Sequence, residues 1–178
     1  MVNPCIFLDR DGVIVVPEFR DGRSFAPKHL QDFAYFPETD IALKRLKAAG
    51  YLLIVVTNQP DVGNGLVQQE VIENMHSKMQ AELPIDHIEV CYHTQTNDCQ
   101  CRKPQPGMLL NVLQKFEIDL EHSFMIGDRS SDIEVGKKLN LKTIFIDYHY
   151  QEPITQIPDF TCFNLSQCAD IILNSKNN

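Results

Sequence analysis

The feature that most constrains the fold is the alternation of short apolar runs with segments whose apolar residues recur every three or four positions. Residues 52–56 are apolar throughout, which is typical of a strand buried on both faces of a sheet. The preceding segment 40–49 has helical spacing, a capping residue at Thr39 or Asp40 and a closing Gly50. This order predicts a parallel sheet covered by helices.

The same alternation continues along the chain. Further strands are predicted at 5–8, 88–91, 124–126 and 143–146, and further helices at about 68–82, 107–116, 132–139 and 167–173. We therefore expect an α/β fold with right-handed crossovers and a doubly wound, mainly parallel sheet of the Rossmann-like kind, with helices on both faces. A ligand is expected in the crevice outside the carboxyl ends of the strands. Segment 17–37, punctuated by Pro and Gly without periodicity, predicts a substrate-facing loop.

Length and charge narrow the class of protein. With 178 residues, 43% of them hydrophobic, the chain predicts one domain over 1–178. A net charge of -8 argues against nucleic acid as a partner, because that affinity rests on clustered Lys and Arg. The run 52–56 is too short to span a membrane, and no secretory pattern opens the chain. We expect a cytoplasmic monomer that acts on a small molecule.

Two carboxylates follow the first predicted strand directly. Residues two apart in an extended segment point to the same side, so Asp9 and Asp11 can face one site roughly 6–7 Å apart. An ionised carboxylate can attack phosphorus when a cation offsets its repulsion from the phosphate, and a second can act as general acid and base. A calcium loop of the EF-hand kind has glycine at its sixth position, whereas Gly12 falls at the fourth. A simple strand-end turn is the remaining alternative.

Other polar residues follow the later strands. Thr57 and Asn58 can donate hydrogen bonds to phosphate oxygens, and Lys103, kept extended by the proline after it, can steady phosphate charge. Asp128 ends an apolar strand, where a carboxylate needs water or a cation. Oxygen ligands of this kind suit Mg²⁺. For Asp132 a structural role at a helix start is favoured. Taken alone, each of these residues also fits a turn or a solvated surface.

Together these residues form four ordered motifs that resemble the haloacid dehalogenase superfamily of phosphohydrolases. The motifs are Asp9-Arg10-Asp11-Gly12, Thr57-Asn58-Gln59, Arg102-Lys103-Pro104 and the segment from Gly127 to Asp132. By this resemblance Asp9 is the nucleophile that forms an aspartyl-phosphate, and Asp11 is the general acid and base. Thr57 and Lys103 stabilise the phosphate, and Asp9, the Asp11 carbonyl and Asp128 bind Mg²⁺.

A second motif indicates a structural metal. Three cysteines and one histidine lie within eleven consecutive positions, at Cys91, His93, Cys99 and Cys101. Four such ligands fill the tetrahedral shell of Zn²⁺ and leave no open position, so we predict a structural zinc loop over 91–101 that holds Arg102 and Lys103 over the site. A set of free thiols or disulfides is the alternative. The remaining cysteines, Cys5, Cys162 and Cys168, are predicted to be small buried residues.

Zinc next to Cys-x-Cys-Arg-Lys-Pro resembles the branch of the superfamily that hydrolyses heptose 1,7-bisphosphates or histidinol phosphate. The resemblance implies loss of the 7-phosphate from the heptose substrate, with Asn58, Arg102 and Arg129 contacting the substrate. Where the heptose enzymes usually carry an arginine, this chain has Asn64. Hydrolysis of histidinol phosphate, phosphoryl transfer to another acceptor and a binding module on the same scaffold are the alternatives.

Overall fold

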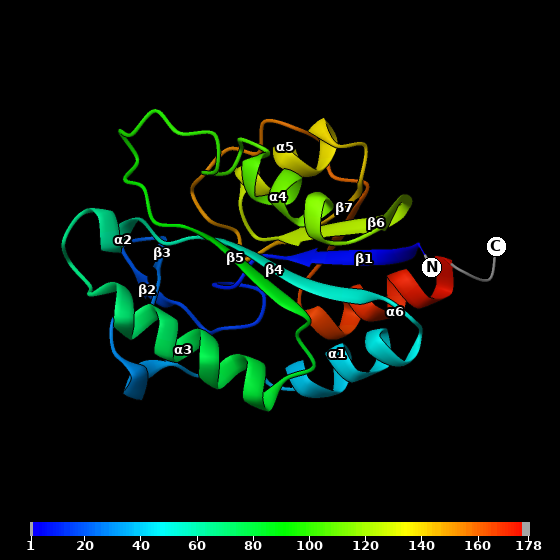
Figure 1. Ribbon diagram of the computed structural model, residues 1–178, viewed down its shortest axis with the longest axis horizontal. Coiled ribbons are helices and arrows are strands. Elements are labelled where there is room, and N and C mark those ends of the chain that lie inside the picture. Colours follow the sequence, from blue (N-terminus) through cyan, green and yellow to red (C-terminus); the bar gives the residue numbers. More distant parts are fainter. Residues whose placement is uncertain (1, 176–178) are drawn as a thin grey trace.

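The computed structural model describes residues 2–175 and contains a six-stranded sheet between two layers of helices (Figure 1). In chain order the elements are β1 Asn3–Leu8, β2 Glu18–Arg20, β3 Arg23–Phe25, the 3₁₀ helix η1 Leu30–Asp32, α1 Thr39–Ala48, β4 Leu52–Asn58, α2 Pro60–Gly63, α3 Gln69–Glu82, β5 His87–Cys91, α4 Gly107–Lys115, β6 Ile118–Gly127, α5 Ser130–Lys138, β7 Lys142–Ile146, β8 Phe160–Cys162 and α6 Leu165–Ser175. The predicted fold class is confirmed.

The sheet order places the carboxyl ends of the central strands together. The order is β5-β4-β1-β6-β7-β8, and all five neighbouring pairs are parallel. The chain runs outward from β1 through β4 and β5 and then returns to the other side of β1 as β6. A change of direction of this kind leaves a crevice beside the central strand, where α/β proteins bind ligands. The motifs after β1, β4 and β6 therefore converge there.

Strand β1 shows how the two hydrophobic cores form. Its side chains alternate: Cys5 and Phe7 pack into the core beneath α4, whereas Ile6 and Leu8 pack into the core beneath α1, α3 and α6. This alternation is the two-residue period of an extended strand. Figure 1 shows the same division, with α4 and α5 over one face and α1, α3 and α6 over the other. Both faces of β1 are buried, which fixes the position of the carboxylate that follows it.

The prediction that 17–37 is loop is wrong in part. Strands β2 and β3 form an antiparallel hairpin in which Arg20 pairs with Arg23. The two turn residues, Asp21 and Gly22, have φ values of 51° and 72°, as a type I′ hairpin turn requires. The strands are three residues each and largely exposed, so no hydrophobic periodicity marks them. The Asp-Gly pair is the signal that identifies this hairpin.

Other differences lie at element boundaries and in the C-terminal segment. Strand β6 begins at Ile118, six residues before the predicted 124–126, and α5 begins at Ser130 instead of about 132. Strand β8 was not predicted, and α6 is longer than 167–173. Cys162 and Cys168 are buried as predicted, but they are not isolated, because their Sγ atoms lie 3.0 Å apart. Among the described residues, no helix combines the length and apolar character that crossing a bilayer requires.

Candidate active site

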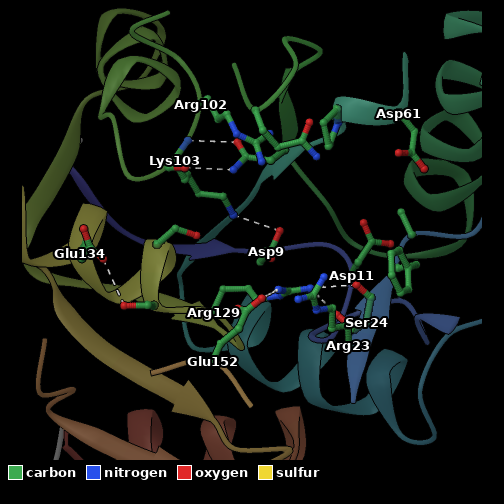
Figure 2. A pocket seen from close by; sticks show the side chains of 17 residues that line it. Asp9, Asp11, Arg23, Ser24, Asp61, Arg102, Lys103, Arg129, Glu134 and Glu152 are labelled. Atoms are coloured by element: carbon green, nitrogen blue, oxygen red, sulfur yellow. Dashed lines mark hydrogen bonds and ion pairs between the residues drawn. The ribbon is translucent and has the colours of Figure 1, made fainter. Parts of the chain in front are cut away.

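A cavity of about 570 Å³ opens at the carboxyl ends of the central strands (Figure 2). The segment directly after β1 supplies Asp9 and Asp11 to its wall, and the segment before α4 supplies Arg102 and Lys103. The hairpin β2–β3 contributes its second strand, so part of 17–37 does line the cavity. The cavity wall therefore combines carboxylates and cations, a composition suited to a charged ligand.

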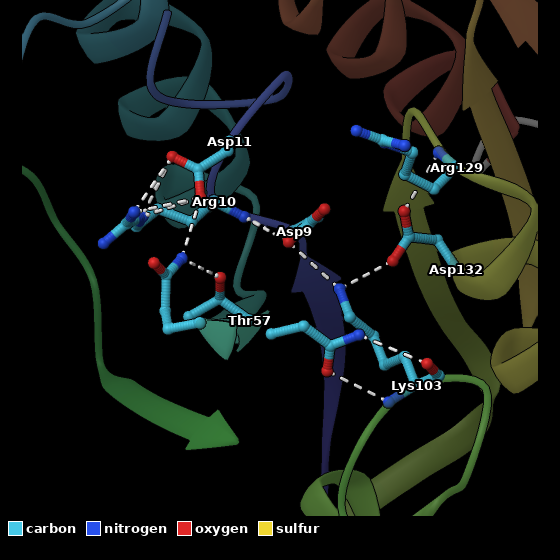
Figure 3. Close-up of polar contacts among 9 residues, drawn as sticks. Asp9, Arg10, Asp11, Thr57, Lys103, Arg129 and Asp132 are labelled. Atoms are coloured by element: carbon cyan, nitrogen blue, oxygen red, sulfur yellow. Dashed lines mark hydrogen bonds and ion pairs between the residues drawn. The ribbon is translucent and has the colours of Figure 1, made fainter. Parts of the chain in front are cut away.

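Lys103 lies at the centre of a buried ion-pair network (Figure 3). Its Nζ is 3.0 Å from an oxygen of Asp9 and donates a hydrogen bond of 2.6 Å to Asp132, and the residue is 3% exposed. Burial favours the neutral amine, but the charges of Asp132 and Asp9 outweigh it and raise the pKa of Lys103. The side chain is therefore a fixed cation beside Asp9, not a solvated surface lysine.

Asp132 has both a structural and a site role. Its carboxylate accepts a hydrogen bond of 3.1 Å from the backbone N–H of Arg129 at the start of α5, which is the helix-start role favoured from the sequence. It also holds Lys103. Burial raises the pKa of Asp132 to about 6, although the charge of Lys103 lowers it. The second role was not predicted, because it depends on a residue 29 positions away.

Asp9, Asp128 and Asp132 form a cluster in which one carboxylate oxygen of each lies within 4.8 Å of the others. Asp128 is 1% exposed, and its Oδ1 atom has no hydrogen-bond partner within the described part of the chain. Burial, together with the charges of Asp9 and Asp132, raises the pKa of Asp128 well above its usual range. A buried carboxylate with an unpartnered oxygen beside two others fits a divalent cation with oxygen ligands, such as Mg²⁺.

Gly12 allows Asp128 to approach the end of β1. A Cβ atom at this position would lie 2.0 Å from the Oδ2 atom of Asp128, and the residue has a φ of 88°. Both observations exclude an ordinary side chain. The Asp-x-Asp-Gly motif therefore ends in glycine for a reason of space as well as of backbone conformation.

Two of the predicted phosphate-contacting residues are engaged with the protein itself. Asn58 donates from Nδ2 to the carbonyl of Lys103 at 3.2 Å and accepts from its N–H at 3.0 Å. Thr57 is 1% exposed and accepts a hydrogen bond of 2.9 Å from Gln59. Asn58 lines the cavity, whereas Thr57 does not. Both lie at the predicted strand end, and their roles toward phosphate stay predictions.

The two predicted substrate-binding arginines differ in their surroundings. The guanidinium of Arg129 donates to the carbonyl and hydroxyl of Ser24 at 2.9 and 2.8 Å and is paired with Glu152, so it joins α5 to the hairpin (Figure 2). Arg102 also lines the cavity, and its Nη1 atom is buried with no partner among the described residues. Arg102 is therefore the more available of the two for an anion.

The four predicted zinc ligands come together after β5. Their ligand atoms all lie within 4.8 Å of one another. Sγ of Cys99 is 3.9 Å from Sγ of Cys91 and 3.7 Å from Sγ of Cys101, close to the separation of about 3.8 Å between thiolates around a tetrahedral Zn²⁺. Sγ of Cys91 and Sγ of Cys101 are only 2.9 Å apart, and Nδ1 of His93 is 3.1 Å from Sγ of Cys101, so these atoms would move apart around an ion. The donor set fits a zinc ion.

Several residues at the site were not predicted. The hydroxyl of Tyr150 donates a 2.8 Å hydrogen bond to Asp128, and Arg10, Gln59 and His76 form a connected group around Asp11. Arg10 and Gln59 stand inside the recognised motifs, so position in the motif was an available signal. Tyr150 and His76 carry no such signal, because only the folded chain brings them to the site.

Comparison with known proteins agrees with this arrangement. Residues 22–146 match the family described as haloacid dehalogenase-like hydrolase. A D-glycero-beta-D-manno-heptose-1,7-bisphosphate 7-phosphatase of Helicobacter pylori is 31% identical over 95% of this chain and 93% of its own length. A D-glycero-alpha-D-manno-heptose-1,7-bisphosphate 7-phosphatase of Mycobacterium bovis is 37% identical over 74% of this chain and 70% of its own length.

A solved structure supports the fold in the same way. The D,D-heptose 1,7-bisphosphate phosphatase of B. bronchiseptica, crystallised with magnesium and phosphate, superposes with a TM-score of 0.80 at 25% identity, covering 97% of this chain and 99% of its own. The predicted resemblance to phosphatases of this superfamily is thus confirmed. The chain belongs to the haloacid dehalogenase-like hydrolase family.

Proposed function

We propose that this protein is a Mg²⁺-dependent phosphatase that removes the 7-phosphate of D-glycero-D-manno-heptose 1,7-bisphosphate through an aspartyl-phosphate on Asp9. One observation carries the proposal: Asp9 directly follows the buried strand β1 at the cavity, 3.0 Å from the fixed ammonium of Lys103 and beside the buried carboxylates of Asp128 and Asp132. A carboxylate can attack phosphorus only where cations neutralise the phosphate charge.

In the first step an Asp9 oxygen forms a bond to phosphorus while the bond from phosphorus to the sugar oxygen breaks. Lys103 neutralises charge on the phosphoryl oxygens, and Asp11 gives its proton to the leaving oxygen. Asp9 and Asp128, with the backbone carbonyl of Asp11, would hold Mg²⁺, which supplies further charge neutralisation when bound. In the second step Asp11 takes a proton from the attacking water, and inorganic phosphate leaves Asp9.

The charges around the cavity favour an anionic substrate. Two carboxylates of the wall that a cationic amine could use are already ion-paired, Asp61 with Lys28 at 3.8 Å and Glu152 with Arg129. A third, Glu134, forms no ion pair within the described chain but accepts hydrogen bonds from the hydroxyls of Ser130 and Thr155. Arg23 and Arg102 both line the cavity, and within the described chain neither side chain forms an ion pair. Guanidinium groups bind phosphate well. Arg102, assisted by Arg23, is therefore the proposed contact for the second phosphate of a bisphosphate.

Asn64 does not take the place of the missing arginine. It lies at the end of α2, where its side chain donates a 3.1 Å hydrogen bond to Gln95, and Gln95, not Asn64, lines the cavity. Arg23 on the hairpin is the proposed replacement for that cation. Heptose bisphosphate is supported over histidinol phosphate by the names of the relatives and by this surplus of unpaired guanidinium groups.

Kinetics on both heptose bisphosphate anomers and on histidinol phosphate test the substrate assignment. We expect the bisphosphate to give the highest kcat/KM, and Arg102→Ala to raise its KM by about tenfold or more with a smaller change in kcat. Arg45→Ala, a change on α1 away from the cavity, is the control.

A tenfold higher kcat/KM for histidinol phosphate would end the heptose assignment and leave only the phosphatase. Phosphate passed to an acceptor without release of inorganic phosphate would indicate a phosphotransferase, and no turnover of any phosphomonoester would indicate a binding module.

We further propose that the loop 91–101 binds one structural Zn²⁺. The support is the donor set itself, three thiols and one imidazole with ligand atoms within 4.8 Å. The loop ends directly before Arg102 and Lys103, so the ion would fix the start of the segment that carries both cations. Elemental analysis of the purified, untagged protein is the test, with one zinc per chain expected after dialysis against magnesium-free buffer.

A further inference from the structure

Arg10, the residue between the two motif carboxylates, has the largest side chain that is completely buried. Its guanidinium does not face the cavity. Instead Nε and Nη2 donate to both oxygens of Asp11, at 3.2 and 3.0 Å (Figure 3). A buried charge of this size is costly unless it is paired and hydrogen-bonded. Pairing with Asp11 meets that cost, and the forked geometry fixes the plane of the Asp11 carboxylate.

The other side of the guanidinium is held by His76 of helix α3. Nη1 of Arg10 is 3.1 Å from Nε2 of His76, a residue only 6% exposed. Burial and the charge of Arg10 lower the pKa of His76 to about 3, so the ring is neutral and Nε2 can accept the hydrogen bond. The ring of Phe33 lies 5.6 Å from the guanidinium carbon. Arg10 is therefore enclosed and contacted on both sides of its guanidinium.

Gln59 completes the set of contacts on Asp11. Its Nε2 donates to Oδ2 of Asp11 at 2.8 Å and to the hydroxyl of Thr57 at 2.9 Å. Arg10 contacts both oxygens of Asp11, and Gln59 adds a contact to Oδ2 alone. Asp11 still lines the cavity, so Oδ1 is the oxygen with fewer contacts and the one left for the cavity.

We propose that Arg10, backed by His76, is a positioning residue that aims the Oδ1 atom of Asp11, which carries the proton when Asp11 acts as the acid, at the leaving oxygen of the substrate. The inference rests on the proposed role of Asp11 as general acid and base. As the phosphorus–oxygen bond to the substrate breaks, its electron pair stays on the leaving oxygen, which takes the proton from Asp11. Without the contacts from Arg10 the Asp11 carboxylate can rotate. The proton is then delivered in fewer of the encounters in which Asp9 attacks.

The test uses leaving groups that do or do not need a proton. An alkyl phosphate leaves as a strongly basic alkoxide and needs the acid, whereas 4-nitrophenyl phosphate leaves as a stable phenolate and does not. The value of kcat/KM reports only steps up to release of the alcohol. We expect His76→Leu to lower kcat/KM about tenfold for the heptose bisphosphate and less than about twofold for 4-nitrophenyl phosphate. Arg10→Lys, which keeps the charge but loses the fork, should show a larger difference of the same kind.

Three controls keep the result interpretable. His76→Gln, which retains an acceptor for Arg10, should restore most of the alkyl phosphate activity. Met75→Leu, a buried change at the neighbouring position of α3, should leave both substrates unchanged. Asp11→Asn should itself lose the alkyl phosphate selectively, and if it does not, the proposed role of Asp11 is what fails. Should Arg10→Lys not fold, the His76 pair carries the test alone.

Equal losses on both substrates in a folded His76→Leu protein would overturn the proposed positioning role of Arg10, because a purely structural role lowers activity on both substrates alike. Unchanged activity on both substrates would overturn it equally. A selective loss in Asp11→Asn, together with no selectivity in the His76 and Arg10 variants, would retain the phosphatase mechanism and reject only the positioning role of Arg10.

Discussion

The two candidate metal sites of this chain differ in how they are built. The candidate zinc ligands come from eleven consecutive positions, 91–101, and four of them satisfy a tetrahedral ion completely. The candidate magnesium cluster combines Asp9, which follows β1, with Asp128, which follows β6, and Asp132 of α5. One buried oxygen of this cluster has no partner among residues 2–175. We call the candidate zinc site the closed site, because its ligands come from one short segment and would fill the shell of the ion. We call the candidate magnesium site the open site, because it needs the whole sheet to assemble it and leaves room for a substrate.

The comparison predicts that the open site can lose its function without loss of the closed one. Asp9→Asn should lower turnover by at least about 10³-fold, because an amide is a poor nucleophile and a poor ligand for Mg²⁺. Its zinc content should stay at one ion per chain. Steady-state kinetics and elemental analysis of one preparation measure both. Full activity in a folded Asp9→Asn protein would remove Asp9 from the mechanism.

The converse change should damage both sites, because the zinc loop leads directly into Lys103. Cys101→Ser should abolish zinc binding, lower the free energy of unfolding by about 3 kcal/mol and reduce kcat/KM by about 10- to 100-fold. Thermal unfolding with elemental analysis is the measurement, and Cys162→Ala, outside the loop, is the control. Retention of stoichiometric zinc by Cys101→Ser would show that the four-ligand assignment is wrong.

The same contrast explains what could be predicted from the sequence. The spacing of the three cysteines and one histidine predicted that they come together, and their ligand atoms do lie within 4.8 Å of one another, while the strand-helix alternation was sufficient for the fold class. Asp9 and Asp128 were placed directly after strands, where the sheet does bring them together. These successes share one cause: a short local pattern indicates an element, and parallel strands align their carboxyl ends.

The contacts that act across the fold could not be predicted. Nothing in the sequence around His76 or Tyr150 indicates that one reaches Arg10 and the other Asp128, because both contacts depend on how α3 and the segment after β7 pack. The hairpin was missed because its strands are short and exposed. The single domain, the monomeric state, the cytoplasmic location and the absence of a nucleic-acid partner stay predictions, as do the individual roles of the site residues.

The stability of the protein should also depend on pH through His76, which contacts Arg10 behind the open site. His76 has a folded pKa of about 3 against about 6.5 when unfolded. Below pH 6.5 the unfolded chain therefore binds a proton that the folded chain does not, and stability falls as pH falls, by about 2 kcal/mol between pH 6.5 and 5. Denaturant unfolding of the protein and of His76→Gln at both pH values isolates this contribution, since other titrating groups are shared. Equal pH dependence in the two proteins would mean that His76 is protonated in the fold.

The smallest effect is expected at Tyr150, which contacts the open site from outside the recognised motifs. Its hydroxyl donates to Oδ2 of Asp128, so it holds the carboxylate in one orientation, while Oδ1 has no partner in the described part of the protein. Removing one hydrogen bond of this kind costs about 1 kcal/mol, and a ligand that must reorient binds its ion correspondingly more weakly. Tyr150→Phe should therefore weaken Mg²⁺ binding about fivefold, measured by calorimetric titration of the zinc-loaded protein without substrate.

Tyr148→Phe is the matched control, because that hydroxyl donates to the carbonyl of Gly12 and not to Asp128. If both variants bound Mg²⁺ as tightly as the unchanged protein, the orientation of Asp128 would be set by Gly12 and the end of β6 alone, and the open site would be as self-sufficient as the closed one.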